Sequence, residues 1–307
     1  MVSKQEFLTR VRDEAKFYLE NKKITSTIDL IGQAIWVLVG VVALSLVGKF
    51  LSQLYDFAII FPCLGGVLLL CFIKKVVSQK KCVFGLKRGL IELSLQAFGL
   101  QRVNRVFKKD FLEKSKIMPE KYHFDFEFKG LGGTKEFYGA SVLTGKKDSK
   151  RRNLLLAIPY STAHNHILIY NQNWMLKFLV AGYEKIEAFF SHKMFDENMI
   201  FAQNKELTST VLNEAFANRL EQLKQALATK IIQKQENETG DLSPKEIIPP
   251  RIDLAFFEGQ LLIYIYDYAL YFDPFDMQEE QTTIAQNFAN LYERFKQLND
   301  AIEILTH

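Results

Sequence analysis

The sequence predicts an α+β protein: a two-helix transmembrane hairpin followed by a cytoplasmic domain with a mostly antiparallel sheet and flanking helices. Two long uncharged apolar stretches lie back to back near the start of the chain, and a strongly basic segment follows them. The remainder alternates strand-like and helix-like patterns, and 307 residues suffice for an anchor plus a domain. We therefore expect an N-terminal amphipathic helix (1–27), a transmembrane helical hairpin (28–73), a basic juxtamembrane helix (74–116) and a cytoplasmic α+β domain (117–307).

The first segment is charged throughout, which excludes an ordinary cleaved signal peptide. Ser3 and Glu6 form the Ser-x-x-Glu pattern of a capping box, which marks the beginning of a helix. Apolar residues then recur at helical spacing. A short amphipathic helix is predicted here, lying on the membrane or against the main domain.

The two apolar stretches have nearly the length that a membrane span needs. Nineteen uncharged residues separate Asp29 from Lys49, and seventeen separate Asp56 from Lys74, against ~20 for ~30 Å of hydrocarbon. A buried helical hairpin of a soluble protein is the alternative, but two such runs in succession are rare in soluble folds. The glycines of the two stretches either allow close helix contact or are simply the glycines common in membrane helices: Gly32, Gly40, Gly48, Gly65 and Gly66.

The charge pattern gives the expected orientation. Residues 74–116 carry twelve Lys and Arg against three Asp and Glu, whereas the connector between the stretches has one lysine, Lys49. Cytoplasmic flanks are rich in Lys and Arg, so both ends of the hairpin are expected inside. A basic segment beside an apolar run favours an anionic membrane surface over nucleic acid; a role in topology alone stays open. The predicted surface contacts are Lys74, Lys75, Lys80, Lys81, Lys87 and Arg88.

Period-two patterns predict the sheet. "YHFDFEFKG", from residue 122, alternates aromatic and polar residues over eight positions, as a strand with one buried face does. "GLGGTK" follows, but it lacks the order of a phosphate-binding loop and precedes another strand, so a hairpin turn is predicted. "NLLLAIPY" and "NHILIYN" predict two further strands.

No residue pattern identifies a catalytic, metal or cofactor site. His164 and His166 alternate and could hold a metal ion, but no third ligand lies nearby in the sequence, and a polar turn is the default interpretation. The three cysteines do not have zinc-ligand spacing. We therefore assign no catalytic residue, no metal ligand and no cofactor, and an enzyme activity stays uncertain.

Helical patterns dominate the last third of the chain. Residues 205–231 predict one amphipathic helix, residues 233–250 an exposed loop, and "RIDLAFFEGQLLIYIYDY" a hairpin turned near Glu258 and Gly259. A final helix is predicted, which either packs into the core of the domain or forms a coiled-coil contact with a partner. Its Leu298–Leu305 end is expected to be the more accessible to a partner. Its apolar stripe is Ile284, Phe288, Leu291, Phe295, Leu298, Ile302 and Leu305.

Taken together, this order of elements resembles bacterial two-pass membrane proteins of the domain-of-unknown-function three-one-three-seven family, over residues 28–305. Two blocks carry the resemblance, the first at Phe195, Asn204, Leu212, Phe216, Leu220 and Leu223, the second at Ile252, Leu254, Phe256, Leu262, Tyr264, Phe272 and Pro274. The resemblance implies a bacterial inner-membrane protein with an α+β cytoplasmic domain, a LemA-type membrane protein as partner and no catalytic residues. The lysine pattern adds the expectation that both termini are cytoplasmic.

Three functional hypotheses follow. The first is a non-enzymatic membrane-anchored protein whose cytoplasmic domain binds a protein partner or forms a homo-oligomer. The second is a membrane-tethered enzyme or small-ligand sensor, which a pocket with convergent polar groups would favour. The third is a secreted effector that inserts into a host membrane.

Overall fold

In the computed structural model, the chain forms two compact units. The sheet unit comprises Met1–Lys4, Ser94–Phe272 and Ala289–His307, and the helical unit comprises Gln5–Leu93 and Asp273–Phe288. The structure describes residues 2–22, 27–51, 60–119, 121–145, 151–160, 166–171, 183–186, 198–230, 247–248, 250–270 and 281–306.

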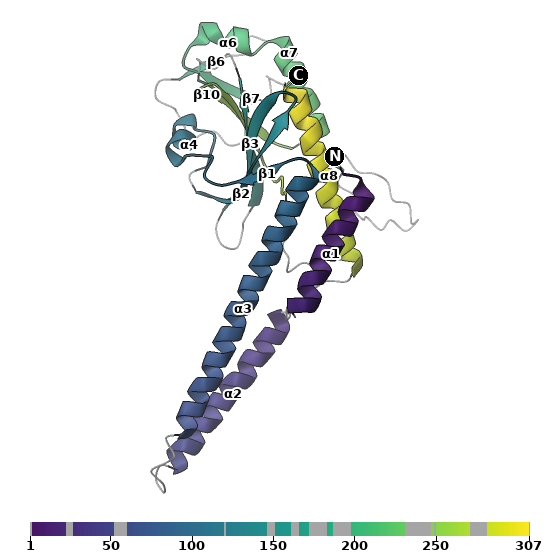
Figure 1. Ribbon diagram of the computed structural model, residues 1–307. Helices are drawn as coiled ribbons and strands as arrows, with labels where there is room; N and C mark the ends of the chain where they lie inside the picture. The colour runs from purple at the N-terminus through teal and green to yellow at the C-terminus, as the bar shows by residue number, and fades with distance from the viewer. Residues whose placement is uncertain are drawn as a thin grey trace, which may run out of the picture. The chain divides into compact units, whose positions relative to one another are not determined.

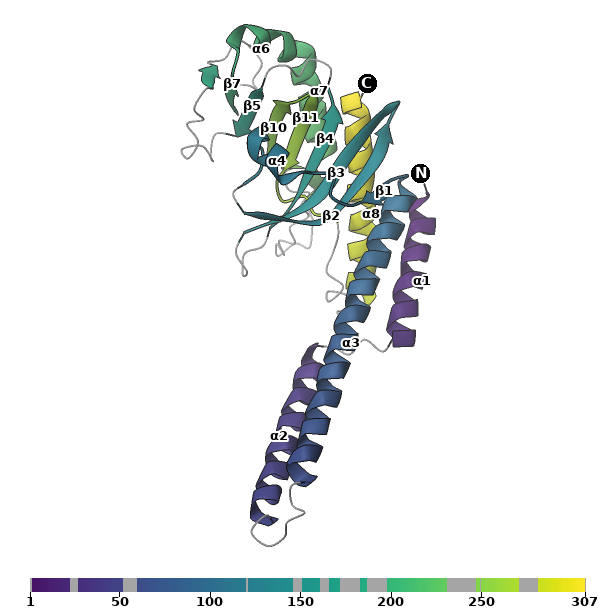
Figure 2. The ribbon, with the colours of Figure 1, turned by 60° about the vertical axis from the view of Figure 1, so that its left-hand side comes forward.

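A nine-stranded sheet forms the centre of the sheet unit, in the order β1-β2-β3-β4-β11-β10-β5-β7-β6 (Figures 1 and 2). Every neighbouring pair is antiparallel, which confirms the predicted α+β class with a mostly antiparallel sheet. The strands are β1 Gln101–Val103, β2 Tyr122–Gly132, β3 Lys135–Thr144, β4 Arg151–Pro159, β5 Ile167–Asn171, β6 Glu184–Ile186, β7 Asn198–Ala202, β10 Ile252–Phe257 and β11 Gln260–Ile265, with β8 Thr229–Lys230 and β9 Ile247–Ile248 paired separately.

Both predicted hairpin turns are present. Glu258 and Gly259 join β10 to β11 with φ values of 46° and 77°, the left-handed backbone that two-residue hairpin turns require. Gly133, with a φ of 60°, lies in the turn between β2 and β3. The glycine-rich stretch before Lys135 is therefore a hairpin turn, as predicted, and not a phosphate-binding loop.

The prediction that β2 buries a single face is wrong, because a bulge interrupts its alternation. Phe124 pairs with Val142 but Phe126 pairs with Ser141, so the register shifts by one residue between the two phenylalanines. An extra residue on one strand moves all later side chains to the opposite face. Phe124 and Phe126 therefore lie on opposite faces of the sheet, and both faces are covered.

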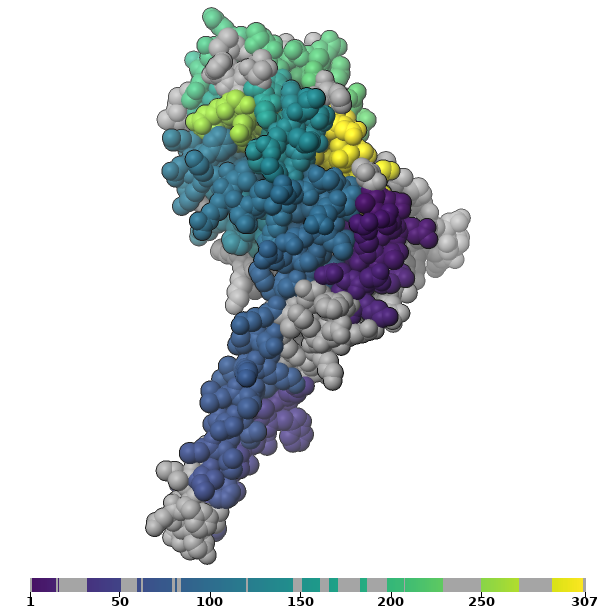
Figure 3. Space-filling model, in the orientation of Figure 1, coloured from purple at the N-terminus to yellow at the C-terminus, as the bar shows by residue number. Residues whose placement is uncertain are grey.

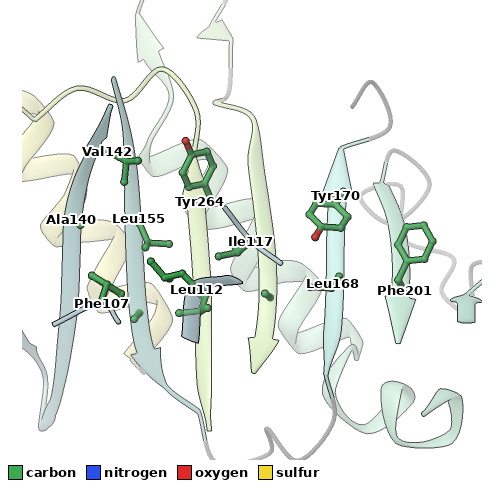
Figure 4. Packing of buried hydrophobic residues seen from close by; sticks show 13 residues of the cluster. Phe107, Leu112, Ile117, Ala140, Val142, Leu155, Leu168, Tyr170, Phe201 and Tyr264 are labelled. Carbon is green, nitrogen blue, oxygen red and sulfur yellow. The ribbon is translucent and has the colours of Figure 1, made fainter. Parts of the chain in front are cut away.

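Helices cover the two faces. Helix α4 (Lys109–Ser115) lies on one face, where Leu112 and Ile117 pack over Leu155 and Tyr264 (Figure 4). Of helix α8 (Gln281–Thr306), the part that belongs to the sheet unit, from Ala289 on, lies behind the strands on the other face (Figures 2 and 4). Both sides of the central strands are consequently buried, and we call the side under α4 the α4 face.

The predicted single helix over residues 205–231 is two helices, α6 (Lys205–Val211) and α7 (Glu214–Ala226). Asn213 separates them in an extended conformation, and its side chain accepts a hydrogen bond from the backbone N–H of Phe216 at 2.9 Å. Asparagine is a strong N-cap residue, so it begins a new helix within an otherwise continuous apolar pattern. The predicted loop at 233–250 lies almost entirely outside the described residues.

The helical unit contains α1 (Lys4–Lys22), α2 (Thr27–Leu51) and most of α3 (Ile60–Ala97). Helix α1 confirms the predicted N-terminal helix. It packs against α3, because a Cβ atom added at Gly89 would lie 2.7 Å from Oε1 of Glu14. Phe7 and Val11 of α1 are fully buried.

Helix α3 runs without a break from the second apolar stretch into the basic segment, since no proline lies between residues 63 and 97. The basic segment is therefore not a separate helix over 74–116. The helix ends at Ala97, where Gly99 takes a φ of 70° and the N–H of Leu100 bonds the carbonyl of Leu95 at 2.8 Å. Strand β1 and helix α4 occupy the rest of the predicted helix.

We expect Gly139→Ala to destabilise the sheet unit by about 1–3 kcal/mol, because the new methyl group would overlap the ring of Phe128. Phe128 is fully buried and lies edge-on against Phe137, so its ring has little room to move. Denaturant unfolding followed by circular dichroism measures the change. An unchanged midpoint would contradict this description of the β2–β3 packing.

Candidate functional site

An exposed apolar surface covers α2. The stretch Gly32–Phe50 is the one described helix that is long and apolar enough to cross a membrane, and only 6 % of it is buried. Nineteen residues at ~1.5 Å each cover roughly 28 Å, close to the hydrocarbon thickness of a bilayer. Trp36 and Phe50 are among its exposed side chains, at 76 % and 67 %.

The beginning of α3 is also apolar and exposed. Its uncharged part within the described residues runs from Ile60 to Ile73 and covers roughly 20 Å, less than a full hydrocarbon layer. Residues 57–59, which complete the predicted second stretch, lie outside the described residues. The structure therefore identifies one candidate span, and the predicted transmembrane hairpin is not established by it. The exposed side chains are Ile60, Leu64, Val67, Leu68, Leu69, Leu70 and Ile73.

Helices α2 and α3 pack side by side in the helical unit (Figure 3). Nζ of Lys75 donates a hydrogen bond to Oε1 of Gln33 at 2.7 Å. Further along, Gly65 approaches Val41, whose Cα atom would lie 3.7 Å from an added Cβ. Gly32, Gly40 and Gly66 have nothing within 4 Å of such an atom, so of these four glycines the predicted close contact occurs at Gly65.

All six basic residues predicted at a membrane surface lie on α3. Lys74, Lys75, Lys81 and Arg88 are exposed and Lys87 is partly exposed, while the side chain of Lys80 is not described. Arg88 pairs with Glu92 one turn along the helix, at 2.9 Å. Because Lys74, Lys81 and Arg88 are seven residues apart, they lie along one side of the helix.

The apolar stripe of α8 is part of the core of the sheet unit. Leu291, Phe295, Leu298 and Ile302 are buried, and Leu305 is partly exposed. The expectation that the end beginning at Leu298 is more open is wrong for Leu298 and Ile302. The side chains of Ile284 and Phe288 lie outside the described residues.

Aromatic contacts hold this stripe in place. The ring of Phe295 stacks on Phe98 at 5.4 Å, and Tyr292 contacts the same ring at 5.3 Å. Nη1 of Arg294 donates to the carbonyl of Ala269 at 2.7 Å. These contacts leave no room for a partner on the buried part of the stripe.

A polar pocket opens at one end of the α4 face. It has a volume of about 440 Å³ and takes residues from β3, β4, β10 and β11 or their ends, together with the segment after α4. It is lined by Pro119, Lys121, Thr144, Gly145, Arg151, Asn153, Arg251, Tyr264 and Tyr266. A second depression of about 520 Å³ shares Lys121 and adds the aromatic residues Phe107, Tyr122 and Phe124.

The pairing of β10 with β11 brings together the residues that form the floor of this pocket. Asp253 pairs with Tyr264, and the N–H of Tyr266 bonds the carbonyl of Arg251 at 3.0 Å. Asp253 is 1 % exposed and accepts a hydrogen bond from the hydroxyl of Tyr266 at 2.6 Å. The guanidinium of Arg251 lies over the ring of Tyr266, 4.3 Å from its centre.

Several donors in the pocket have no acceptor. Nε and Nη2 of Arg251 and the hydroxyl of Tyr264 are buried and make no hydrogen bond, and the Tyr122 hydroxyl in the neighbouring depression is in the same state. These are four of the seven such atoms in the described residues. A buried polar group without a partner costs about 1–3 kcal/mol, so this concentration requires an explanation.

The environment of the two pocket tyrosines keeps them protonated. Burial raises the pKa of Tyr264, and the side chains of Thr144 and Asn153, which bond each other at 2.8 Å, also approach its hydroxyl and oppose that rise. Burial and then the negative charge of Asp253 raise the pKa of Tyr266. Both hydroxyls can therefore act as donors at any physiological pH.

His166 is buried on the α4 face, so a polar turn does not describe it. Its Nε2 donates to the carbonyl of Ser115 at 3.2 Å, which leaves Nδ1 to accept from the hydroxyl of Tyr183. Burial lowers the pKa of His166 to about 4, with the nearby Lys116 acting in the same direction. Its partner in the metal hypothesis, His164, lies outside the described residues.

No group of three His, Cys, Asp or Glu side chains in the described ranges could hold a metal ion. The buried carboxylate of Glu127 is occupied by the backbone, because it accepts from the N–H groups of Arg105 and Phe107. Within the described residues of the sheet unit, the polar pocket is the strongest candidate binding site, and our sequence analysis did not find it. The sequence held one signal for it. Arg251 and Asp253 are alternate residues before a tight turn, and Tyr264 and Tyr266 are alternate residues after it, so the four are expected on one face of the hairpin.

Comparison with known proteins gives little further information. No family model and no curated protein matches the chain, so the resemblance to the domain-of-unknown-function family stays a prediction. Among solved structures, the chain is similar to the crystal structure of the mycobacterial trehalose monomycolate transport factor A, TtfA, with 7 % identity and a TM-score of 0.36. The match covers 70 % of this chain and 93 % of that chain. A likeness of this size carries no argument about function.

We expect Phe295→Ala to destabilise the sheet unit by about 3–5 kcal/mol, because it leaves a cavity against Phe98. The exposed neighbour Lys296→Ala is the matched control and should change stability by less than about 0.5 kcal/mol. Denaturant unfolding and light scattering are measured together. A folded Phe295→Ala protein of unchanged stability but lower particle mass would instead assign this residue to an interface.

His166 makes the fold sensitive to acid. Its folded pKa of about 4 lies below the unfolded value of 6.5, so protonation favours the unfolded chain. Its contribution is therefore complete above pH 6.5 and is lost as pH falls toward 4, by roughly 2–3 kcal/mol. The free-energy difference between wild type and His166→Gln should accordingly shrink from pH 7 to pH 4.5. A constant difference over that range would show that His166 does not titrate as described.

Proposed function

We propose that this chain is a two-pass membrane-anchored protein in which α2 and α3 form a hairpin across the bilayer. The observation that carries the proposal is the apolar surface of α2, which is exposed along nearly its whole length. Soluble monomers rarely expose contiguous apolar patches larger than a few hundred Å². A lipid environment would cover this surface, whereas the core helix of a soluble domain would already be buried.

The contact between Lys75 and Gln33 supports a hairpin with both ends on one side of the membrane. Gln33 lies at the beginning of the first apolar stretch and Lys75 just after the end of the second. Their 2.7 Å hydrogen bond pairs the polar ends of the two stretches at one level. A lysine at that level can extend its ammonium group into the headgroup layer while its stem stays in the apolar region.

The lysine-rich end of α3 faces the cytoplasm in this proposal, because positive charge remains on the side from which a hairpin inserts. The continuity of α3 also limits which cations reach the headgroups. Arg88 lies fourteen residues beyond Lys74, roughly 21 Å along the helix axis, and a Debye length is ~8 Å. Lys74, Lys75, Lys80 and Lys81 therefore serve as the surface contacts, and Arg88 is too far away when the helix stands upright.

The sheet unit would then act as the cytoplasmic binding module of a bacterial inner-membrane protein, without a catalytic step of its own. The binding partner is another membrane protein, of LemA type if the family resemblance holds, or a second copy of this chain. The buried part of the α8 stripe is excluded as the contact, because Phe295 and Leu298 are used within the sheet unit. The apolar surface of α2 and α3 is the better candidate for association within the bilayer.

Reporter fusions at Lys4, Gln53 and His307 test the topology. We expect cytoplasmic signals from Lys4 and His307 and an external signal from Gln53, because the connector carries one lysine and both flanks carry several. The protein should also remain in the membrane fraction after an alkaline wash. A cytoplasmic signal at Gln53, or release by the wash, would rule out the two-pass anchor.

Charge-reversed variants give a sharper test. Reversing Lys74, Lys75, Lys80 and Lys81 to Glu should reduce correct insertion, as judged by loss of the external signal at Gln53. The matched control reverses four lysines outside the helical hairpin, namely Lys205, Lys224, Lys230 and Lys296. Equal effects of the two changes would show that total charge, and not its position beside the apolar stretch, determines the orientation.

A further inference from the structure

We propose that the polar pocket at the end of the α4 face binds a small anion through a phosphate or carboxylate group. This inference concerns the sheet unit alone and does not depend on the membrane anchor. The pocket lies where the ends of β3, β4, β10 and β11 meet the segment that follows α4. Its volume of about 440 Å³ is within the range of small-ligand sites.

The charges that face the pocket favour an anion. Lys121 and Arg151 are exposed at its edge, and the side chain of Arg251 is 26 % exposed. Arg151 is only weakly neutralised by Asp267, because the two are 3.7 Å apart and each is more than 60 % exposed. The other carboxylate, Asp253, is buried and already bonded to the hydroxyl of Tyr266.

The unpaired hydrogen-bonding groups in the pocket are donors. Nε and Nη2 of Arg251 form one edge of the guanidinium, the edge that binds carboxylate and phosphate oxygens in pairs. The stack on Tyr266 holds that plane, and the hydroxyl of Tyr264, which approaches Thr144 and Asn153 without a well-formed hydrogen bond, can add a third donor. A phosphate or carboxylate group, whose oxygens accept hydrogen bonds, would match these donors.

Asn153, another polar side chain of the floor, is bonded at both ends of its amide within the protein. Nδ2 of Asn153 donates to Oγ1 of Thr144 at 2.8 Å, and its Oδ1 accepts from the N–H of Asp267 at 3.0 Å. Asn153 therefore positions the ends of the strands and does not compete for a ligand. The neighbouring depression, which shares Lys121, offers Phe107, Tyr122 and Phe124 to an apolar part of the same ligand.

A purely structural arrangement is the competing explanation. Nη2 of Arg251 lies 3.8 Å from Oδ2 of Asp253, so a small shift of either side chain would join them in an ordinary buried ion pair. That explanation predicts no effect of added anions beyond that of ionic strength. Anion binding predicts saturable stabilisation, because a ligand that binds only the folded state raises its stability.

The test is thermal unfolding of the full chain in a neutral detergent, with inorganic phosphate added at constant ionic strength. We expect a saturable rise in the melting temperature. The double variant Lys121→Gln/Arg151→Gln should weaken the apparent phosphate affinity about tenfold through the loss of two charged contacts. These side chains are exposed, so the variant should fold even if Arg251→Gln does not.

The matched control is the double variant Lys205→Gln/Arg219→Gln, which removes the same charge from exposed positions on α6 and α7. It should retain the wild-type affinity. A second arm replaces free phosphate with phosphatidylglycerol in mixed micelles; stabilisation by the lipid alone would identify a lipid headgroup as the ligand. No saturable effect in either arm, or equal affinities in the pocket and control variants, would overturn the proposal.

Discussion

The register of the β10–β11 hairpin determines most of what the sheet unit can do. These strands lie in the middle of the sheet, and nearly all of their residues are buried on one face or the other. The turn at Glu258 and Gly259 sets the pairing, and a slip of one residue would exchange the two faces. Phe256 would then leave Phe216 of α7, and Asp253 would leave the pocket.

This register could be predicted from the sequence, whereas the full set of residues that lines the pocket could not. A two-residue turn at Glu258 places Asp253 opposite Tyr264 by counting alone. Lys121, Thr144 and Asn153 come from parts of the chain whose position depends on the order of the sheet. Local patterns do not contain that order, because strand β11 lies beside β4, about a hundred residues earlier in the chain.

The other differences from the sequence analysis also arise from single residues that interrupt a regular pattern. The bulge beside Asp125 leaves the alternation of aromatic residues intact in the sequence while it moves Phe124 and Phe126 to opposite faces. Gly99 ends α3 although apolar spacing continues beyond it, and Asn213 divides a helix whose apolar residues still recur. Periodicity identifies whether an element is a helix or a strand. A single cap residue or a bulge, however, changes where the element ends or which face it buries, and leaves the apolar pattern almost unchanged.

The α4 face shows how the fold treats the polar groups that it buries. Glu127 is held by two backbone N–H groups, and His166 is bonded on both ring nitrogens. Asn153 uses both ends of its amide. Polar groups with a structural role on this face are therefore satisfied by the protein itself, as buried polar groups generally are.

Arg251 and Tyr264 differ from that pattern on the same face and within the same two strands. Two nitrogens of Arg251 are buried without hydrogen bonds, which is destabilising, and an apolar residue of similar size would remove the penalty. Fully paired neighbours show that the surrounding backbone can supply partners where stability requires them. The unused donors therefore distinguish the pocket from the rest of the core, and an anion is the simplest partner that would complete it.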